Sequence, residues 1–365
     1  MLSRRIYVGT LLTIAAFLGG CGGRSSNDEH ATLSNTDPAA VAAAPNQSKP
    51  STQMQAVLDE LALLGAKPVE TLTVEQARSQ STPADAVKAL LIKQGKSTNP
   101  ESVANVVESS LPGPAGPIPI SIYTPAGSGP FPVILYIHGG GWVIANRKVY
   151  DSSARALTNA AAAIVVSTDY RGGPENRFPA AHDDTFSAYK WVLANASSFN
   201  GDANRVAVVG ESAGGSLAAS IAIRSRDQGI RLPVYQVLIY PVTNYAFNTA
   251  SQLDNMNTAP LSTKSLMWFY ERYLNTPADG NNPLFSVLRA NLQGLPPATV
   301  ITADNDPLRS EGAAYAQRMR DAGVVVDYRN YTGVTHEFFG MGAVLDQANQ
   351  AVNQAAAGLK KSFAK

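Results

Sequence analysis

Ser212 is the serine with the clearest chemical context, in residues 206–215 (VAVVGESAGG). An apolar β-branched run precedes it and an alanine-rich helical pattern follows it, which predicts a sharp strand-to-helix turn. Such a turn projects the hydroxyl towards a base, as a serine nucleophile needs. Gly210 and Gly214 would let the crowded backbone close, and the N–H of Ala213 could face an oxyanion. The stretch predicts acyl transfer, with a plain glycine-rich turn as the alternative.

A second glycine-rich stretch, residues 138–142 (HGGGW), directly follows the apolar run VILYI. Three glycines at the end of a strand let the backbone approach a ligand and turn several N–H groups the same way. A tetrahedral intermediate of acyl transfer needs such donors. We therefore expect Gly140 and Gly141 to form an oxyanion hole with Ala213.

The base for the serine should be a histidine, because its pKa lies near neutrality. The chain has four histidines. His30 lies in a polar N-terminal stretch, His138 in the glycine-rich stretch, and His182 early in a helical pattern. His336 follows the last strand pattern. Proteins with this type of turn order their residues serine, acid, histidine along the chain, so His336, the only histidine after Ser212, is the predicted base.

Two aspartates are candidates for the acid that orients the histidine. Asp304 and Asp306 lie in the segment ATVITADNDPL, just after an apolar run. Pro307 disfavours helical geometry at the residue before it, which suits a side chain held at the end of a strand. Asp306 is therefore the favoured acid and Asp304 the alternative, with a loop-organising role as its other interpretation.

Composition limits the remaining function classes. The 365 residues are 45% hydrophobic and 16% charged, with a formal net charge of +1 and no long basic run, so we expect no nucleic-acid partner. No histidine or cysteine cluster has metal-ligand spacing, and we expect no metal. Cys21 is the only cysteine, which excludes a disulfide framework within the chain.

The N-terminus has the pattern of an export signal. Arg4 and Arg5 precede an apolar stretch at residues 6–18 that is too short to span a bilayer as a mature helix. The following Leu-Gly-Gly-Cys, ending at Cys21, resembles a bacterial lipobox. This implies a lipoprotein signal peptide at 1–20, a lipid anchor on Cys21 and a flexible tether over 21–50. The alternative is a plain signal peptide with an incidental cysteine.

A lipobox implies an exported, membrane-anchored lipoprotein. Gly22, rather than aspartate, follows the cysteine, which resembles the sorting pattern of outer-membrane lipoproteins. The expected location is therefore the outer membrane, on its periplasmic face or at the cell surface.

Alternating apolar runs and helical patterns predict an α/β fold over residues 51–365. Continuous apolar runs such as FPVILYIH, AAIVVSTDY and VYQVLIYP are typical of strands covered on both faces. The helical patterns between them predict a mostly parallel sheet with helices on both sides. Segments 51–100 and 243–282 fall outside this alternation, and we interpret them as two parts of a helical cap.

The motifs together resemble the hormone-sensitive-lipase-like branch of the α/β-hydrolases, the bacterial family IV esterases. They are HGGGW, DYRGGPENRFPAAHDD, GESAGG, DNDPLRSEG and HEFF, in this order. The resemblance implies an eight-stranded sheet with a cap, and cofactor-free hydrolysis of esters with short to medium acyl chains. It also implies that Ser212, Asp306 and His336 form the triad and that Gly140, Gly141 and Ala213 form the oxyanion hole. Glu211 departs from the aspartate found in many relatives.

The resemblance leaves the substrate open. Small-molecule carboxylic esters are the expected substrates, and amides, lactones or thioesters are alternatives because they share the acyl-enzyme chemistry. A non-catalytic ligand-binding protein is a further alternative, which the presence of His336 disfavours. We expect some cap aromatics to line an apolar pocket, with Trp142 the first candidate for substrate contact. The sequence does not define the oligomeric state.

Overall fold

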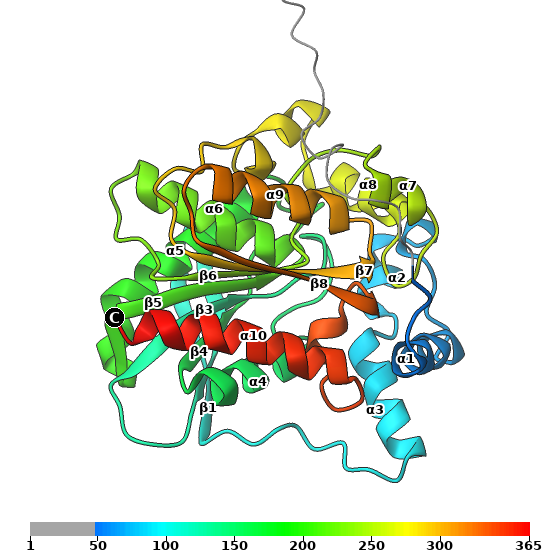
Figure 1. Cartoon of the computed structure of the whole chain (residues 1–365), viewed down its shortest axis with the longest axis horizontal. Coiled ribbons are helices and arrows are strands. Elements are labelled where there is room, and N and C mark those ends of the chain that lie inside the picture. The colour runs from blue at the N-terminus through cyan, green and yellow to red at the C-terminus, as the bar shows by residue number, and fades with distance from the viewer. Residues whose placement is uncertain (1–47) are drawn as a thin grey trace, which may run out of the picture. The chain divides into compact units, whose positions relative to one another are not determined.

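The computed structural model describes residues 48–365, and these contain one eight-stranded sheet (Figure 1). The order of the strands is β1-β2-β4-β3-β5-β6-β7-β8. The strand bounds are β1 Asn105–Gly113, β2 Gly116–Thr124, β3 Phe131–Ile137, β4 Ile164–Thr168, β5 Gly201–Glu211, β6 Gln236–Ile239, β7 Ala298–Asn305 and β8 Val326–Thr335. This sheet confirms the predicted α/β-hydrolase architecture.

The sheet is parallel except at one edge. β2 pairs antiparallel with both β1 and β4, and every other neighbouring pair is parallel. In β3 all residues except Pro132 are buried, and all eight residues of β7 are buried. Strands covered on both faces lose the alternation of polar and apolar residues, which explains the continuous apolar runs of the sequence.

Helices cover both faces of the sheet (Figure 1). α5, α6 and α9 lie on one face, where they share a core with Val133 and Leu135 of β3. α4 and α10 lie on the other face and pack with Ile134 and Tyr136 of the same strand. The helix bounds are α4 Asp151–Ala161, α5 Ala180–Asn195, α6 Ala213–Asp227, α9 Arg309–Asp321 and α10 Asp346–Phe363.

The segments predicted as cap form short helices. Serine or threonine side chains cap all five at their N-termini, so their orphan N–H groups have partners. Trp268 of α8 donates through Nε1 to the carbonyl of Leu72, 3.2 Å away, and this bond joins the two segments. The bounds are α1 Thr52–Leu63, α2 Val74–Ser79, α3 Pro83–Lys93, α7 Ala250–Asp254 and α8 Thr263–Tyr273.

The strands of the N-terminal hairpin, β1 and β2, extend to a tight turn between Gly113 and Gly116, and their main-chain pairing continues through the prolines there. At the other end of the chain α10 begins at Asp346, and residues 338–340 form a separate 3-10 turn after His336.

Candidate active site

Ser212 lies on a strained turn between β5 and α6, with φ +56° and ψ −120°. The turn closes because its two glycines lack a side chain. A Cβ on Gly210 would lie 2.0 Å from the carbonyl oxygen of Gly214, and one on Gly214 would lie 2.1 Å from that of Ile137. The predicted need for glycine at both positions thus follows from direct backbone contact.

His336 lies within hydrogen-bonding distance of both other predicted triad residues, Ser212 and Asp306. His336 Nε2 is 2.9 Å from Ser212 Oγ, and His336 Nδ1 is 2.7 Å from Asp306 Oδ2. With Nδ1–H donating to the carboxylate, Nε2 is free to accept the serine proton. The side chains come from the ends of three strands, β5, β7 and β8, which meet at the carboxyl edge of the parallel part of the sheet.

Asp306 and Asp304 occupy different environments. Asp306 is fully buried, and its second oxygen accepts from the N–H of Leu308 at 2.8 Å. Asp304 points to the other side, where Asn330 donates to it at 3.1 Å and Arg309 lies 3.4 Å away. Asp304 therefore organises the loop, which was one of its two interpretations, and Asp306 contacts the histidine.

The other described histidines have structural partners. His138 Nδ1 lies 2.8 Å from the Gly139 carbonyl, and its ring stacks on Tyr170. Burial lowers the pKa of His182 to about 3 despite the Leu284 carbonyl beside it. Neither ring lies within hydrogen-bonding distance of the serine. His30 lies outside the described residues.

The predicted oxyanion-hole glycines adopt left-handed backbone conformations beside Ser212. φ is +96° at Gly140 and +58° at Gly141, and the Gly140 carbonyl accepts from the N–H groups of Val143 and Ile144. A Cβ on Gly141 would lie 2.3 Å from the ring of Phe269. The loop is thus held between its own turn and α8. Ala213 begins α6, where N–H groups lack intrahelical partners.

A cavity of about 470 Å³ opens onto Ser212 and His336. Gly140, Gly141 and both cap segments line it, and most of its wall is apolar. Its volume suits a small-molecule ligand. Trp142 also borders the cavity, but its ring is 1% exposed and stacks on Tyr273. Contact between Trp142 and a substrate remains a prediction.

The electrostatic setting favours a basic histidine. Burial by itself lowers the pKa of His336, but the charge and hydrogen bond of Asp306, with smaller contributions from Glu337 and Glu211, raise it above its usual value. A raised pKa means that the imidazolium is stabilised once the serine proton has been transferred.

Residues 48–365 contain no group of three or more histidine, cysteine, aspartate or glutamate side chains that could hold a metal ion.

Sequence reasoning missed the polar residues behind the triad. Tyr136 donates to Glu211 at 2.5 Å, Tyr240 donates to the same carboxylate, and Tyr150 donates to Glu337 at 2.8 Å. In the sequence Glu211 precedes the catalytic serine and Glu337 follows the catalytic histidine. This adjacency was the signal that the sequence offered. The tyrosines could be found only from the pairing of the strands.

Comparisons with known proteins agree with this site. A family model described as the alpha/beta hydrolase fold matches residues 134–340. Ethyl acetate hydrolase of Pseudomonas putida is 32% identical over 290 residues, 78% of this chain and 89% of that protein. Carboxylesterase NlhH of Mycobacterium tuberculosis is 36% identical over 259 residues, 67% and 79% of the two chains. A solved esterase of Pyrobaculum calidifontis superposes with a TM-score of 0.77 at 36% identity, covering 86% and 98%.

The chain therefore belongs to the α/β-hydrolase family. Within that family the relatives and the structural neighbour named above are ester hydrolases, and the protein is a carboxylic ester hydrolase. The predicted signal peptide, Cys21 and most of the predicted tether lie outside the described residues. Among residues 48–365, no helix has the length and apolarity to cross a bilayer.

The contrast between the two aspartates gives a direct test of the triad. Asp306→Asn keeps the shape of the side chain but removes the charge that holds the His336 tautomer, so kcat should fall by about 10⁴-fold. Asp304→Asn is the matched control and should keep kcat within about threefold, since Asp304 does not contact His336. Steady-state kinetics on a p-nitrophenyl ester provides the measurement. Equal losses in the two variants would contradict the assignment.

Proposed function

We propose that this carboxylic ester hydrolase is a serine esterase that cleaves small-molecule esters with short to medium acyl chains through an acyl-enzyme. The observation that carries the proposal is the Ser212–His336–Asp306 hydrogen-bond chain at the floor of a largely apolar cavity. Such a cavity favours a ligand with apolar surface, because apolar side chains make up most of its wall.

The reaction proceeds in two acyl-transfer steps. His336 Nε2 takes the proton of Ser212 as Oγ attacks the ester carbonyl, and the N–H groups of Gly140, Gly141 and Ala213 stabilise the oxyanion. The imidazolium then protonates the leaving alcohol, and the acyl group remains on Ser212. Water, deprotonated by His336, attacks the acyl-enzyme and releases the carboxylic acid.

The proposed chain-length limit rests on the cap segments. Leu58 and Leu61 of α1 and Pro260 and Leu261 before α8 line the cavity above the serine. Their apolar side chains favour an acyl chain, while the finite volume of about 470 Å³ limits its length. The name of the relative ethyl acetate hydrolase denotes a short ester, which supports the short end of the range. Amides, lactones and thioesters remain the alternative substrates.

A panel of p-nitrophenyl esters from acetyl to palmitoyl tests the chain length. The value of kcat/KM should peak at a short or medium acyl chain and fall at least tenfold by palmitoyl, because longer chains exceed the cavity. Leu61→Ala enlarges the acyl pocket and should move the peak towards longer chains. Leu253→Ala, at a largely exposed leucine that does not line the cavity, is the control. A profile that rises up to palmitoyl, or faster cleavage of matched amides, would contradict the proposal.

We further propose that the protein is exported and anchored to a membrane through a lipid on Cys21, by way of the segment 21–50. The lipobox-like sequence and the low content of large apolar residues up to Pro50 support this proposal. The outer membrane, at its periplasmic face or the cell surface, is the proposed destination.

Expression of the full chain in a bacterial host tests the anchor. The mature protein should begin at Cys21, carry acyl groups detectable by mass spectrometry, and sediment with membranes. Cys21→Ser should abolish acylation and membrane association while leaving the kcat of any folded enzyme unchanged, because Cys21 precedes the catalytic domain. An unmodified Cys21 in a membrane-bound mature protein would argue against the lipid anchor.

A further inference from the structure

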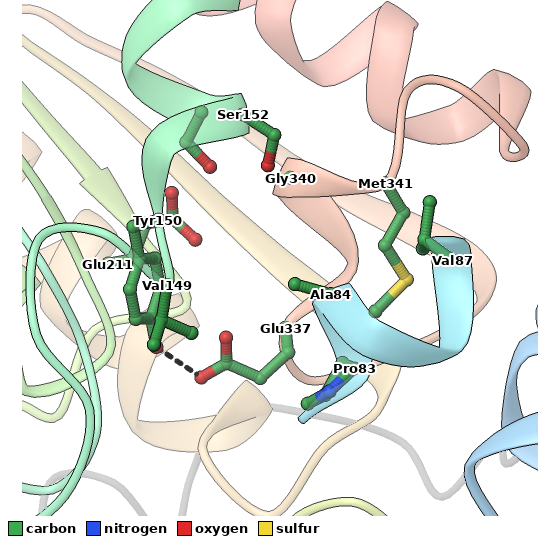
Figure 2. Close-up of a pocket in the computed structure, with 11 residues that line it drawn as sticks. Pro83, Ala84, Val87, Val149, Tyr150, Ser152, Glu211, Glu337, Gly340 and Met341 are labelled. Carbon is green, nitrogen blue, oxygen red and sulfur yellow. Dashed lines mark hydrogen bonds between the residues drawn. The ribbon is translucent and has the colours of Figure 1, made fainter. Parts of the chain in front are cut away.

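Two glutamates enclose a second, smaller cavity behind the catalytic residues. Glu211 directly precedes Ser212, and Glu337 directly follows His336. Both line a cavity of about 30 Å³ together with Tyr150, and Figure 2 shows their carboxyl groups on its wall. Glu211 is 1% exposed. The side chain of Glu337 is 21% exposed and lines the large cavity as well, so it separates the two spaces.

Neither carboxyl group is accounted for by an ion pair with lysine or arginine among residues 48–365. Glu211 accepts from Tyr136 and Tyr240, and Glu337 accepts from Tyr150, the bond drawn as a dashed line in Figure 2. Three buried tyrosines therefore fix the positions of the two groups. Proteins rarely enclose two neighbouring carboxyl groups without compensating cations, because their repulsion disfavours double ionisation.

The backbone at Glu337 is in the left-handed region, with φ +70°. Glycine adopts this conformation freely, whereas a residue with a long side chain does so at a cost in free energy. Such outliers cluster at functional sites, where the surrounding structure holds them in place. The strained backbone at Glu337 holds its carboxylate against His336. A side chain that pointed to bulk solvent would not need a strained backbone.

The carboxyl group of Glu337 faces the catalytic histidine. Its Oε1 lies 3.8 Å from His336 Nε2, the nitrogen that is also 2.9 Å from Ser212 Oγ. Asp306 occupies the opposite edge of the ring, at Nδ1. The imidazole thus lies between two carboxyl groups, and its face packs against Tyr240, with 4.5 Å between ring centroids.

Burial raises the pKa of both glutamates. Burial, then the charge of Glu337, raises the pKa of Glu211 to about 7, even though Tyr136 and Tyr240 donate hydrogen bonds that oppose this shift. Burial also raises the pKa of Glu337, and His336 and Tyr150 oppose that shift. The buried hydroxyl of Ser153 lies on the same cavity wall, and its interaction with Glu211 also opposes the rise in the pKa of Glu211.

We propose that Glu337 is a second acid for His336, a positioning residue whose carboxylate stabilises the imidazolium formed during acyl transfer. Asp306 orients the ring through Nδ1, and Glu337 adds negative charge beside Nε2. The proposal rests on the role of Ser212 and His336 in acyl transfer and extends the site to one residue outside the triad.

The sign of the pH effect follows from the groups around His336. Asp306, Glu337 and Glu211 all raise the pKa of the histidine, against burial, which lowers it. The neutral imidazole is the working base, so activity is lost as pH falls through this raised pKa. Removing the charge of Glu337 should therefore move the acidic limb of the kcat/KM profile to lower pH and lower kcat at the plateau.

Glu337→Gln tests the charge with little change in shape. On a p-nitrophenyl ester we expect kcat to fall about tenfold with KM within about twofold, and the acidic limb to move down by on the order of half a pH unit. Glu337→Asp keeps a charge and should recover part of both effects. An unchanged limb, or a shift to higher pH, would overturn the proposal, because a merely structural role would not move the limb downwards.

Glu337→Gly separates backbone strain from charge. Glycine suits φ +70°, so this variant should be at least as thermostable as the unsubstituted protein while losing as much kcat as Glu337→Gln. Ala162→Gly is the matched control, since Ala162 is an exposed left-handed residue at the end of α4 with φ +51°, and should leave the pH profile unchanged. Full activity in Glu337→Gly would overturn the proposal.

Fluorophosphonate labelling of Ser212 should persist in every variant. The absence of labelling in the unsubstituted protein would instead count against the serine mechanism.

Discussion

The contact on which the site depends is the close approach of three backbone segments beneath Ser212. Gly210, Gly214 and the carbonyl of Ile137 meet at distances that exclude any Cβ. This contact holds the serine at φ +56°, with its hydroxyl above the carboxyl edge of the sheet. It also fixes the end of β3 against the start of α6, so the oxyanion-hole loop lies beside the nucleophile. The strain at one residue thereby positions both the attacking oxygen and the donors that receive the oxyanion.

The parallel sheet supplies the remaining geometry. Strands β5, β7 and β8 end at the same edge, and the residue directly after each strand is a member of the triad. The cap segments line the cavity at this edge, and most of its wall is apolar. In such surroundings the carboxylates around His336 stabilise the imidazolium more strongly than they would in water. The site thus combines an apolar cavity for the ester with a histidine base that neighbouring carboxylates stabilise in its protonated form.

Sequence patterns predicted most of this arrangement, because its requirements are local. A strained serine needs flanking glycines, an oxyanion hole needs a glycine-rich strand end, and Pro307 marks the geometry of Asp306. The sheet with helices on both faces followed from apolar runs too long to alternate. The choice between Asp304 and Asp306 needed the structure, since both side chains leave the same loop in different directions.

The residues that the sequence did not reveal act across the fold. Tyr136 and Tyr240 reach Glu211 only because β3 and β6 both pair with β5, and neither tyrosine belongs to a recognisable motif. The left-handed backbone at Glu337 is likewise invisible in a pattern of residue types. The positions of side chains that hydrogen-bond to the neighbours of a catalytic residue depend on strand register. A single sequence does not determine that register.

The central claim is that Ser212 is the nucleophile activated by His336. Labelling with a fluorophosphonate, followed by peptide mass spectrometry, tests this most directly. We expect one adduct, on Ser212, that is absent in Ser212→Ala, forms much more slowly in His336→Asn, and blocks ester hydrolysis in proportion to its occupancy. An adduct on another residue, or ester turnover by Ser212→Ala at the rate of the unsubstituted protein, would contradict the account.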